Sequence, residues 1–416
     1  MKERLIVYLR DSRIGFIEFD SDANSREFSY DAAYLASSEA RPISLSLPLQ
    51  PEPFNSWQTR LFFENLLPPE VVRRKLEKII HHDHNNYFAF LKVLGGDCAG
   101  AISLYPEDVD PLRQEDVLRE LSEDEADDIF RALPQSPLLQ GVVDNYRISV
   151  AGAQDKLVVR LRGGRISLPL FGSASTHIVK PGMVRCEHSV ENECFCQRLA
   201  AAVGLLSAGS VILPVRGKRY YVTERYDRKL VGGHVERYLQ EDFCQAMGVD
   251  SEKKYQTDGG PSAARCFRFL REHSFGLADQ MRLVDFYLYN FLIGNADAHA
   301  KNFSLLYTGG RPAVAPLYDA MSTLVYPNVY NSMAMEIGGH YEFKDVTRTS
   351  FAAFAGKCDI SPRAVLDRLD ALAETLPGKA EELAAEMSDE GNPSPIYAQI
   401  VEVIRGQIAR VKAKTI

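Results

Sequence analysis

The chain has 416 residues, a formal net charge of −8, 45% hydrophobic residues and 25% charged residues. These values are ordinary for a folded protein of more than one domain, and the negative charge disfavours sequence-independent binding to nucleic acid. Seven scattered cysteines without a CxxC pair predict reduced thiols and no zinc site. No apolar run approaches the roughly 20 residues of a membrane span, and the N-terminus lacks a signal-peptide core, so we expect a cytoplasmic protein.

The N-terminal region, residues 1–108, is predicted to mix strands and helices. Residues 5–9 and 13–19 read as paired strands around a polar turn. Residues 42–47 alternate with a period of two, which predicts a further strand. Helical spacing over residues 57–80 completes a small α/β unit.

An acidic connector at residues 109–142 follows, with a helix predicted over residues 114–133. Residues 143–239 are predicted to be rich in strands, because Gly163-Gly164 separates two β-branched runs in the manner of a hairpin. A helix is predicted over residues 190–203.

Residues 240–416 are predicted to be mostly helical. The predicted helices span residues 263–273, 277–291, 362–375, 379–386 and 396–412. A small β-rich part before a large helical part is the order of a bilobal, protein-kinase-like α+β fold. We therefore predict a β-rich N-lobe, preceded by an extra α/β subdomain, and a large helical C-lobe.

The segment after the helix predicted at residues 277–291 carries the sharpest chemical signal. Asp297 and Asn302 are five residues apart, which is the D-x-x-x-x-N spacing of kinase catalytic loops. Phosphoryl transfer needs a carboxylate to orient and deprotonate the attacking hydroxyl. It also needs an oxygen ligand for Mg²⁺, and an asparagine amide supplies one. This spacing alone is common, so the assignment depends on further elements.

Two further elements complete a kinase-like set. Asp319 follows a predicted hairpin after the catalytic loop, where kinases place a metal-binding aspartate. Lys180 ends an apolar strand, where a lysine that binds phosphate belongs. Glu193, on the helix that follows, is a candidate ion-pair partner for Lys180, and Glu191 competes with it for this role.

A loop of small residues precedes the predicted hairpin. Residues 149–156 read Ser-Val-Ala-Gly-Ala-Gln-Asp-Lys, which is neither a Walker loop nor G-x-G-x-x-G. Small side chains allow backbone N–H groups to approach phosphate, so this loop is the candidate phosphate-binding segment.

Together these segments resemble the HipA family of bacterial toxin kinases. The motifs in the kinase part are S-x-A-G-A-Q-x-K at 149–156, I-V-K-P at 178–181, E-R-Y-D-R at 224–228, Q-E-D-x-C-Q at 240–245, D-x-H-x-K-N at 297–302 and Y-D at 318–319. Those of the N-terminal part are S-L-S-L-P-L at 44–49, F-F-E-N-L-L-P at 62–68 and G-D-C-A-G-A at 96–101. The resemblance runs over nearly the whole chain.

The resemblance implies a serine/threonine protein kinase that uses ATP and Mg²⁺, with Asp297 as catalytic base and with Asn302 and Asp319 as metal ligands. It places the following residues at ATP: Ala151, Gly152, Ala153, Gln154, Asp155, Lys156, Lys180, Glu224, Arg225, Tyr226, Gln240, His299, Lys301, Asn302, Tyr318 and Asp319.

The resemblance also implies regulation and partners. Ser149 matches a serine whose autophosphorylation ejects the loop and silences the kinase. Family members pair with a helix-turn-helix antitoxin, through which they meet operator DNA. The implied substrate is a protein of the translation apparatus, such as an aminoacyl-tRNA synthetase. No membrane is implied.

Three other interpretations compete with a toxin kinase. D-x-H-x-x-N also resembles small-molecule kinases such as those of aminoglycosides. Asp297, His299 and Asp319 could instead be ligands of a metal-dependent phosphoesterase. A catalytically silent kinase fold could act only as an antitoxin-bound repressor subunit.

Overall fold

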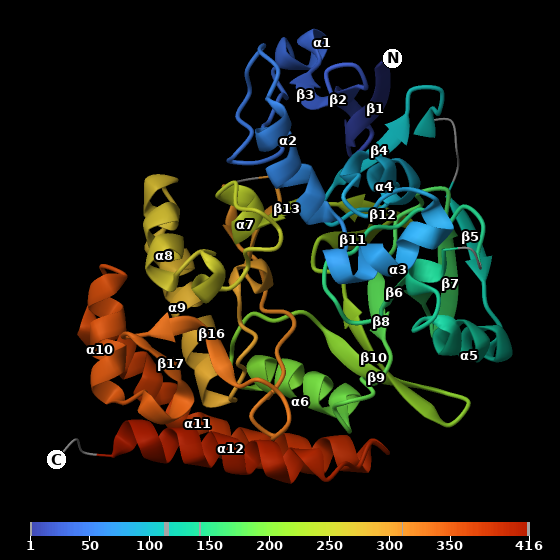
Figure 1. The fold of residues 1–416 in the computed structure, drawn as a ribbon. Coiled ribbons are helices and arrows are strands. Elements are labelled where there is room, and N and C mark those ends of the chain that lie inside the picture. Colours follow the sequence, from blue (N-terminus) through green and yellow to red (C-terminus); the bar gives the residue numbers. More distant parts are fainter. Residues whose placement is uncertain (1, 112–115, 141–142, 310, 414–416) are drawn as a thin grey trace.

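The structure is a computed structural model that describes residues 2–111, 116–140, 143–309 and 311–413. Figure 1 shows an N-terminal region at the top, a sheet-rich lobe on the right and a helical lobe on the left and along the bottom. This is the bilobal α+β arrangement, with an added N-terminal subdomain, that the order of elements predicts.

The N-terminal region is built on a four-stranded antiparallel sheet. In sheet order its strands are β3 (Ser25–Tyr30), β2 (Ser12–Asp20), β1 (Lys2–Leu9) and β4 (Ile102–Pro106). Its helices are α1 (Ala32–Leu35), α2 (Ser56–Phe63), α3 (Glu70–Ile80) and α4 (Tyr87–Leu94), with a 3₁₀ turn at Glu64–Leu66. The sheet and α2, α3 and α4 bury a shared hydrophobic core, so this region has a core of its own.

The second lobe contains a six-stranded antiparallel sheet. In sheet order its strands are β5 (Val117–Glu120), β7 (Arg165–Leu170), β6 (Leu157–Arg162), β8 (His177–Lys180), β10 (Lys218–Glu224) and β9 (Ser210–Val215). Gly163 and Gly164 join β6 to β7 with φ values of 56° and 79°, so the predicted hairpin is confirmed. Helix α5 (Glu123–Ala132) covers one face through Phe130, whose ring lies 4.6 Å from that of Tyr220.

Helix α6 (Ser189–Ala202) lies in the sequence between β8 and β9 and contacts both the second sheet and the helical lobe. A hairpin of β11 (Arg228–Val231) and β12 (His234–Arg237) follows β10 and precedes the helical lobe. The helices of this lobe are α7 (Phe243–Ala246), α8 (Ala263–Glu272), α9 (Leu277–Leu292), α10 (Arg348–Lys357), α11 (Pro362–Asp389) and α12 (Ile396–Lys412). Its strands are β13 (Leu239–Asp242), β14 (Ser304–Tyr307), β15 (Ala313–Val314), β16 (Ser332–Ile337) and β17 (His340–Glu342). Every residue of α9 from Leu283 onward is buried, so α9 is the axis on which this lobe packs.

The helix predicted over residues 114–133 is only partly correct. Residues 112–115 lie outside the described part of the chain, so the start of that prediction is not described. Strand β5 follows and pairs with β7, and the helix begins only at Glu123, where Ser122 and Glu125 form a capping box. The connector therefore contributes an edge strand to the second sheet.

Two other predictions differ from the structure. The strand predicted over residues 42–47 is wrong, because Ser44 and Leu45 donate their hydrogen bonds to the carboxylate of Glu241 instead of to a neighbouring strand. The two helices predicted over residues 362–386 are one helix, α11, which continues through Pro377. Burial on both sides of the proline, at Leu376 and Ala380, offsets the lost backbone hydrogen bond.

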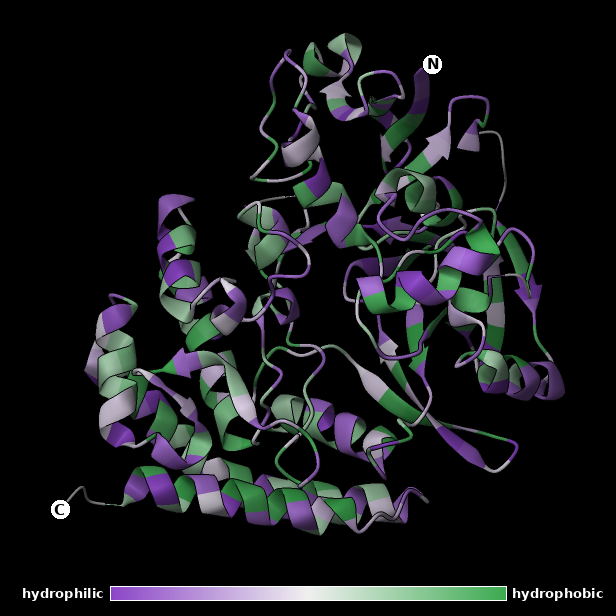
Figure 2. Cartoon of the chain, in the orientation of Figure 1, coloured by the Kyte–Doolittle hydropathy of each residue, from purple (hydrophilic) through white to green (hydrophobic). Residues whose placement is uncertain are grey.

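Most helices and strands contain both hydrophobic and hydrophilic residues, and Figure 2 shows both kinds along α11 and α12. This is the pattern of helices with one buried face. Within the described ranges, no helix has both the length and the apolar character that a membrane crossing requires.

A buried ionic network joins the N-terminal region to the second lobe. Asp97 is fully buried and accepts hydrogen bonds from Ser175 Oγ at 2.6 Å, Arg228 Nη2 at 2.8 Å and Arg225 Nη1 at 3.2 Å. Asp227 contacts both arginines at 2.9 Å. Burial alone would raise the pKa of Asp97, but the two guanidinium groups outweigh it and hold this pKa below its ordinary value.

The carboxyl group of Glu241 forms a second buried junction, between the N-terminal region and the helical lobe. Its carboxylate accepts hydrogen bonds from Ser44 Oγ at 2.5 Å, Tyr307 Oη at 2.5 Å and the Leu45 amide at 3.2 Å. Burial raises the pKa of Glu241 to about 7, although these donors oppose the rise. Because the unfolded chain loses this proton near pH 4.5, Glu241 contributes stability that is complete below pH 4.5 and is lost as the pH rises to about 7.

We therefore expect Glu241→Gln to reduce the loss of stability between pH 4.5 and pH 7.5 by about 1–3 kcal/mol. Glutamine keeps the shape of the side chain and carries no titrating proton. Urea unfolding at both pH values measures the effect. Glu236→Gln is the matched control, because Glu236 also accepts a tyrosine hydroxyl but is exposed. An unchanged pH dependence in Glu241→Gln would contradict the assignment.

Candidate active site

The catalytic-loop motif lies directly after α9. Gly294 ends the helix with φ 70°, and Asn295 turns the chain by accepting a hydrogen bond from the Asp297 amide at 3.0 Å. Asn302 Nδ2 donates to the backbone carbonyl of Asp297 at 2.8 Å. The loop is thus closed on itself, which fixes the separation of the Asp297 carboxylate and the Asn302 amide.

The side chain of Asp297 is half exposed and has a hydroxyl partner. Tyr255 Oη donates to Asp297 Oδ1 at 2.6 Å. Burial and the nearby carboxylate raise the pKa of Tyr255, so this phenol stays protonated and acts as a donor. His299 Nε2 lies 4.0 Å from Asp297 Oδ2. Burial lowers the pKa of His299 to about 4, although Asp297 opposes this effect, so the imidazole is neutral near pH 7.

Lys180, at the end of β8, is paired with two carboxylates. Its ammonium lies 2.6 Å from Glu193 Oε1 and 2.6 Å from Asp319 Oδ1. Glu191 instead contacts Arg219 at 3.0 Å, so Glu193 is the residue of α6 that faces the site. Burial lowers the pKa of Lys180, but Asp319 and Glu193 outweigh it and hold this pKa above its ordinary value. The lysine is therefore an ammonium that links the two lobes.

Asp319 has an uncommon backbone conformation, with φ 59°. Contacts on both sides of it hold the chain in place. A parallel bridge joins Ser207 to Leu317, and Asn192 of α6 exchanges two hydrogen bonds of 2.9 Å with the backbone of Ser322. Such strain persists only where surrounding contacts determine it, and it is concentrated at functional sites.

The segment predicted to bind phosphate borders the same space. Lys156 Nζ donates to the Ala151 carbonyl at 2.6 Å, so the loop closes over its own lysine. Gly152 has φ 102°, which favours glycine. Burial and then the charge of Lys180 lower the pKa of Lys156 to about 8. The exposed or half-buried members of this loop are Ala151, Gly152, Ala153, Gln154 and Asp155.

The connection between the lobes contains the residues expected at adenine. Glu224 ends β10 and is exposed. Tyr226 Oη donates to Gln240 Oε1 at 2.6 Å, and its ring lies 5.3 Å from that of Tyr318. Tyr318 Oη in turn donates to the Lys301 carbonyl at 2.7 Å. Among the described residues, neither the amide nor the carbonyl of Tyr226 takes part in a backbone–backbone hydrogen bond.

Two residues predicted to bind ATP have side chains that are engaged elsewhere. The Arg225 guanidinium lies in the buried network with Asp97, so it supports the connection between the lobes. Lys301 Nζ donates to Asp242 Oδ2 at 2.7 Å and to Asn65 Oδ1 of the N-terminal region. Both contacts are structural, and the prediction that these two residues bind ATP stays a prediction.

Ser149 lies beside the same part of the N-terminal region. Its side chain is fully buried, and Oγ donates to the Leu66 carbonyl at 2.6 Å. Leu66 directly follows Asn65, which holds Lys301. One short segment thus contacts both the catalytic loop and the residue predicted to be phosphorylated.

Oxygen donors at the site fit a hard divalent cation. Asn302 uses its Nδ2 internally, which leaves the amide oxygen as a potential ligand. Asp319 is exposed, and only its Oδ1 contacts Lys180. Carboxylate and amide oxygens are the ligands that Mg²⁺ accepts, whereas a transition metal would favour an imidazole. His299 Nε2 is instead within 2.9 Å of the Lys254 ammonium.

Lys254 and Tyr255 are the residues of the site that the sequence did not reveal. They lie between α7 and α8, more than 40 positions before the catalytic loop, and belong to none of the motifs. The Asp97 network was not predicted either, although its residues lie in the motifs at 96–101 and 224–228, because its ion pairs join segments about 130 residues apart.

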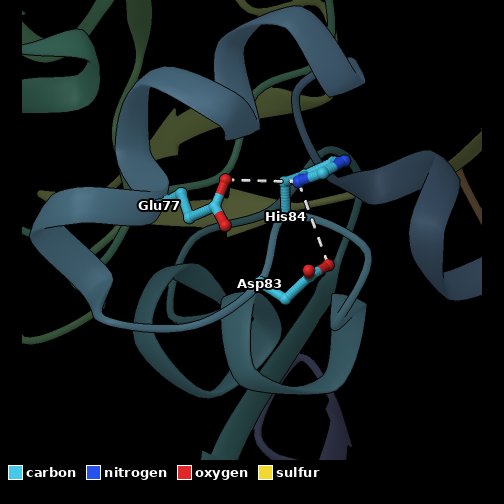
Figure 3. A group of neighbouring side chains, drawn as sticks. All are labelled: Glu77, Asp83 and His84. Carbon is cyan, nitrogen blue, oxygen red and sulfur yellow. Dashed lines mark hydrogen bonds and ion pairs between the residues drawn. The ribbon is translucent and has the colours of Figure 1, made fainter.

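A separate acidic group lies at the end of α3. Figure 3 shows Glu77 and Asp83 facing the ring of His84, with oxygens 3.2 Å and 3.8 Å from Nδ1. The other ring nitrogen faces Glu70 at 3.4 Å. Both nitrogens therefore have carboxylate partners, which accounts for the group as a polar junction between α3 and the loop that leads to α4.

Comparison with known proteins identifies the family. The family model of the HipA N-terminal domain matches residues 5–105, and that of the HipA-like C-terminal domain matches residues 148–380. A Sinorhizobium fredii protein named "Putative kinase Y4mE" is 40% identical over 368 residues, 87% of each chain. The serine/threonine-protein kinase toxin HipA of Shewanella oneidensis is 29% identical over 390 residues, 90% of this chain and 87% of that protein.

A solved structure agrees with these matches. A Shewanella oneidensis complex of HipA, HipB and operator DNA superposes with a TM-score of 0.85 at 26% identity, covering 98% of this chain and 97% of that chain. The fold is therefore kinase-like. The chain belongs to the HipA family.

Proposed function

We propose that this protein is an ATP- and Mg²⁺-dependent serine/threonine protein kinase that acts as the toxin of a toxin–antitoxin pair. The observation that carries the proposal is the convergence of Lys180, Asp319 and Asp297 from three separate segments. Lys180 contacts Asp319 at 2.6 Å, and the charges of Asp297 and Asp319 both act on the pKa of His299. A phosphoesterase built on His299 is disfavoured, because its Nε2 already has a cation beside it.

The residues divide the chemistry between them. Tyr255 fixes one oxygen of Asp297, which leaves Oδ2 to accept the proton of the substrate hydroxyl. The hydroxyl oxygen bonds to the γ-phosphorus, the bond from that phosphorus to the β–γ bridging oxygen breaks, and ADP leaves. Lys180 binds the α- and β-phosphates. Bound Mg²⁺, held by Asn302 and Asp319, would neutralise charge on the transferred group.

Autophosphorylation of Ser149 is proposed as the silencing step. The buried hydroxyl donates to a carbonyl, and a phosphate in that place would set an anion against the Leu66 oxygen. The loop must therefore leave its position to accept a phosphate, and it cannot return afterwards. Release of residues 151–156 would remove the predicted phosphate-binding backbone at the same time.

The test is incubation of the purified protein with Mg²⁺ and γ-labelled ATP. We expect label at Ser149, located by mass spectrometry, and progressive loss of transfer to added casein. Ser149→Ala should lack that label and keep phosphorylating casein at its initial rate. Transfer only to an aminoglycoside, or no transfer at all, would contradict a protein kinase.

The partner is proposed to be a helix-turn-helix antitoxin, through which the protein meets operator DNA. The support is the superposition on a complex of HipA, HipB and operator DNA over nearly the full chain. The substrate is proposed to be a protein of the translation apparatus, such as an aminoacyl-tRNA synthetase. Growth arrest on expression, reversed by co-expression of the neighbouring antitoxin gene, tests the pairing, and phosphoproteomics in the arrested cells tests the substrate.

A further inference from the structure

Lys254 places a cation directly beside the catalytic loop. Its ammonium lies 2.9 Å from His299 Nε2 and 4.9 Å from the centre of the Tyr255 ring. The Tyr255 and His299 rings meet edge to face at 5.3 Å, and the Tyr255 hydroxyl reaches Asp297. The Lys254 side chain is therefore positioned by the same two rings that border the proposed base.

No carboxylate of the described residues forms an ion pair with Lys254, and the contact with His299 does not neutralise its charge. An ammonium can only donate, so His299 Nε2 accepts and Nδ1 carries the ring hydrogen. That Nδ1 is buried and has no hydrogen-bond partner among the residues that the structure describes. An ammonium has three hydrogens, so after this contact two hydrogens of Lys254 are left for an anion.

The other three lysines of the site have partners that limit them. Lys180 is neutralised by Glu193 and Asp319, and Lys301 is paired with Asp242. Lys156 donates to a carbonyl of its own loop. Lys254 is close enough to Lys156 for its charge to contribute to the lowered pKa of that residue.

We propose that Lys254 binds the γ-phosphate of ATP beside Asp297. The inference rests on the proposed kinase function and deepens it. Charge on the transferred phosphoryl group spreads over its outer oxygens in the transition state, and a fixed cation there accelerates transfer. Lys180 binds the α- and β-phosphates, whereas Lys254 binds only the γ-phosphate and so distinguishes ATP from ADP.

The experiment compares ATP with ADP by titration calorimetry in the presence of Mg²⁺, in an Asp297→Asn background that prevents turnover. We expect Lys254→Met to weaken ATP binding about tenfold or more and to change ADP binding less than about threefold. Lys180→Met should weaken both nucleotides. A purely structural role of Lys254 would weaken both together, so the split between ATP and ADP separates the two explanations.

Two further variants sharpen the test. Lys254→Arg should recover most of the ATP preference, because it keeps the charge. Lys253→Met is the matched control, since Lys253 is the adjacent, exposed lysine, and it should bind both nucleotides like the parent. Equal losses for ATP and ADP in Lys254→Met, or no loss, would overturn the inference and leave the kinase proposal standing. A parent protein that binds neither nucleotide would overturn both.

Discussion

Replacement of Asp297 by asparagine should reduce phosphoryl transfer at least about 1,000-fold. The variant keeps the shape of the side chain and loses both the negative charge and the proton acceptor. Positioned proton transfer and electrostatic stabilisation supply most of the catalysis in phosphoryl transfer, so no other group compensates. Initial rates of label transfer to casein, measured with the Ser149→Ala protein as parent, give the ratio without interference from silencing.

The fold should survive this change. The Asp297 side chain is half exposed, and Tyr255 can donate to an amide oxygen as it does to the carboxylate. We expect a thermal midpoint within a few degrees of the parent. Asp258→Asn is the matched control, because Asp258 is an exposed aspartate of the segment that carries Tyr255. A rate above about a tenth of the parent's in Asp297→Asn would remove Asp297 from the role of base.

Replacement of Asp97 by alanine should destabilise the protein by about 3–5 kcal/mol. Removal of this carboxylate leaves Arg225 and Arg228 sharing only Asp227 in a space that excludes water. A buried charge without its counterion costs far more than an exposed ion pair contributes. The shift of the urea unfolding midpoint, monitored by the fluorescence of the protein's tyrosines and tryptophan, measures the loss.

Asp370→Ala is the matched control for this prediction. Asp370 also forms a bidentate pair with an arginine, Arg348, but both side chains are partly exposed. Its removal should cost no more than about 1 kcal/mol. If Asp97→Ala and Asp370→Ala unfold at the same urea concentration, the buried network does not stabilise the junction.

The chemistry-bearing motifs could be read from the sequence because they are local or recur in a fixed order. The Asp297–Asn302 loop, the hairpin before Asp319 and the strand ending at Lys180 are each short segments with their own pattern. The choice between Glu191 and Glu193 needed the structure, because it depends on which face of α6 turns toward β8. Lys254 could not be found by pattern, because its role comes from a tertiary contact with His299.

The errors in the secondary structure have related causes. Residues 42–47 have the alternation of a strand, but the fold supplies a buried carboxylate, Glu241, that takes their donors. Pro377 reads as a break, but packing on both sides of it keeps α11 continuous. In each case tertiary contacts outweighed the secondary-structure preference of the local sequence.

The contacts made by Asn65 and Leu66 bear on how this protein can be shortened. The N-terminal region has its own sheet and core, which invites its removal to obtain a minimal catalytic fragment. Such a cut would strip Lys301 of Asn65, Ser149 of the Leu66 carbonyl, and the hinge arginines of Asp97. The first hundred residues therefore support the candidate active site from outside it. A truncated chain would keep all the kinase motifs in its sequence but would lose the contacts that hold them in place.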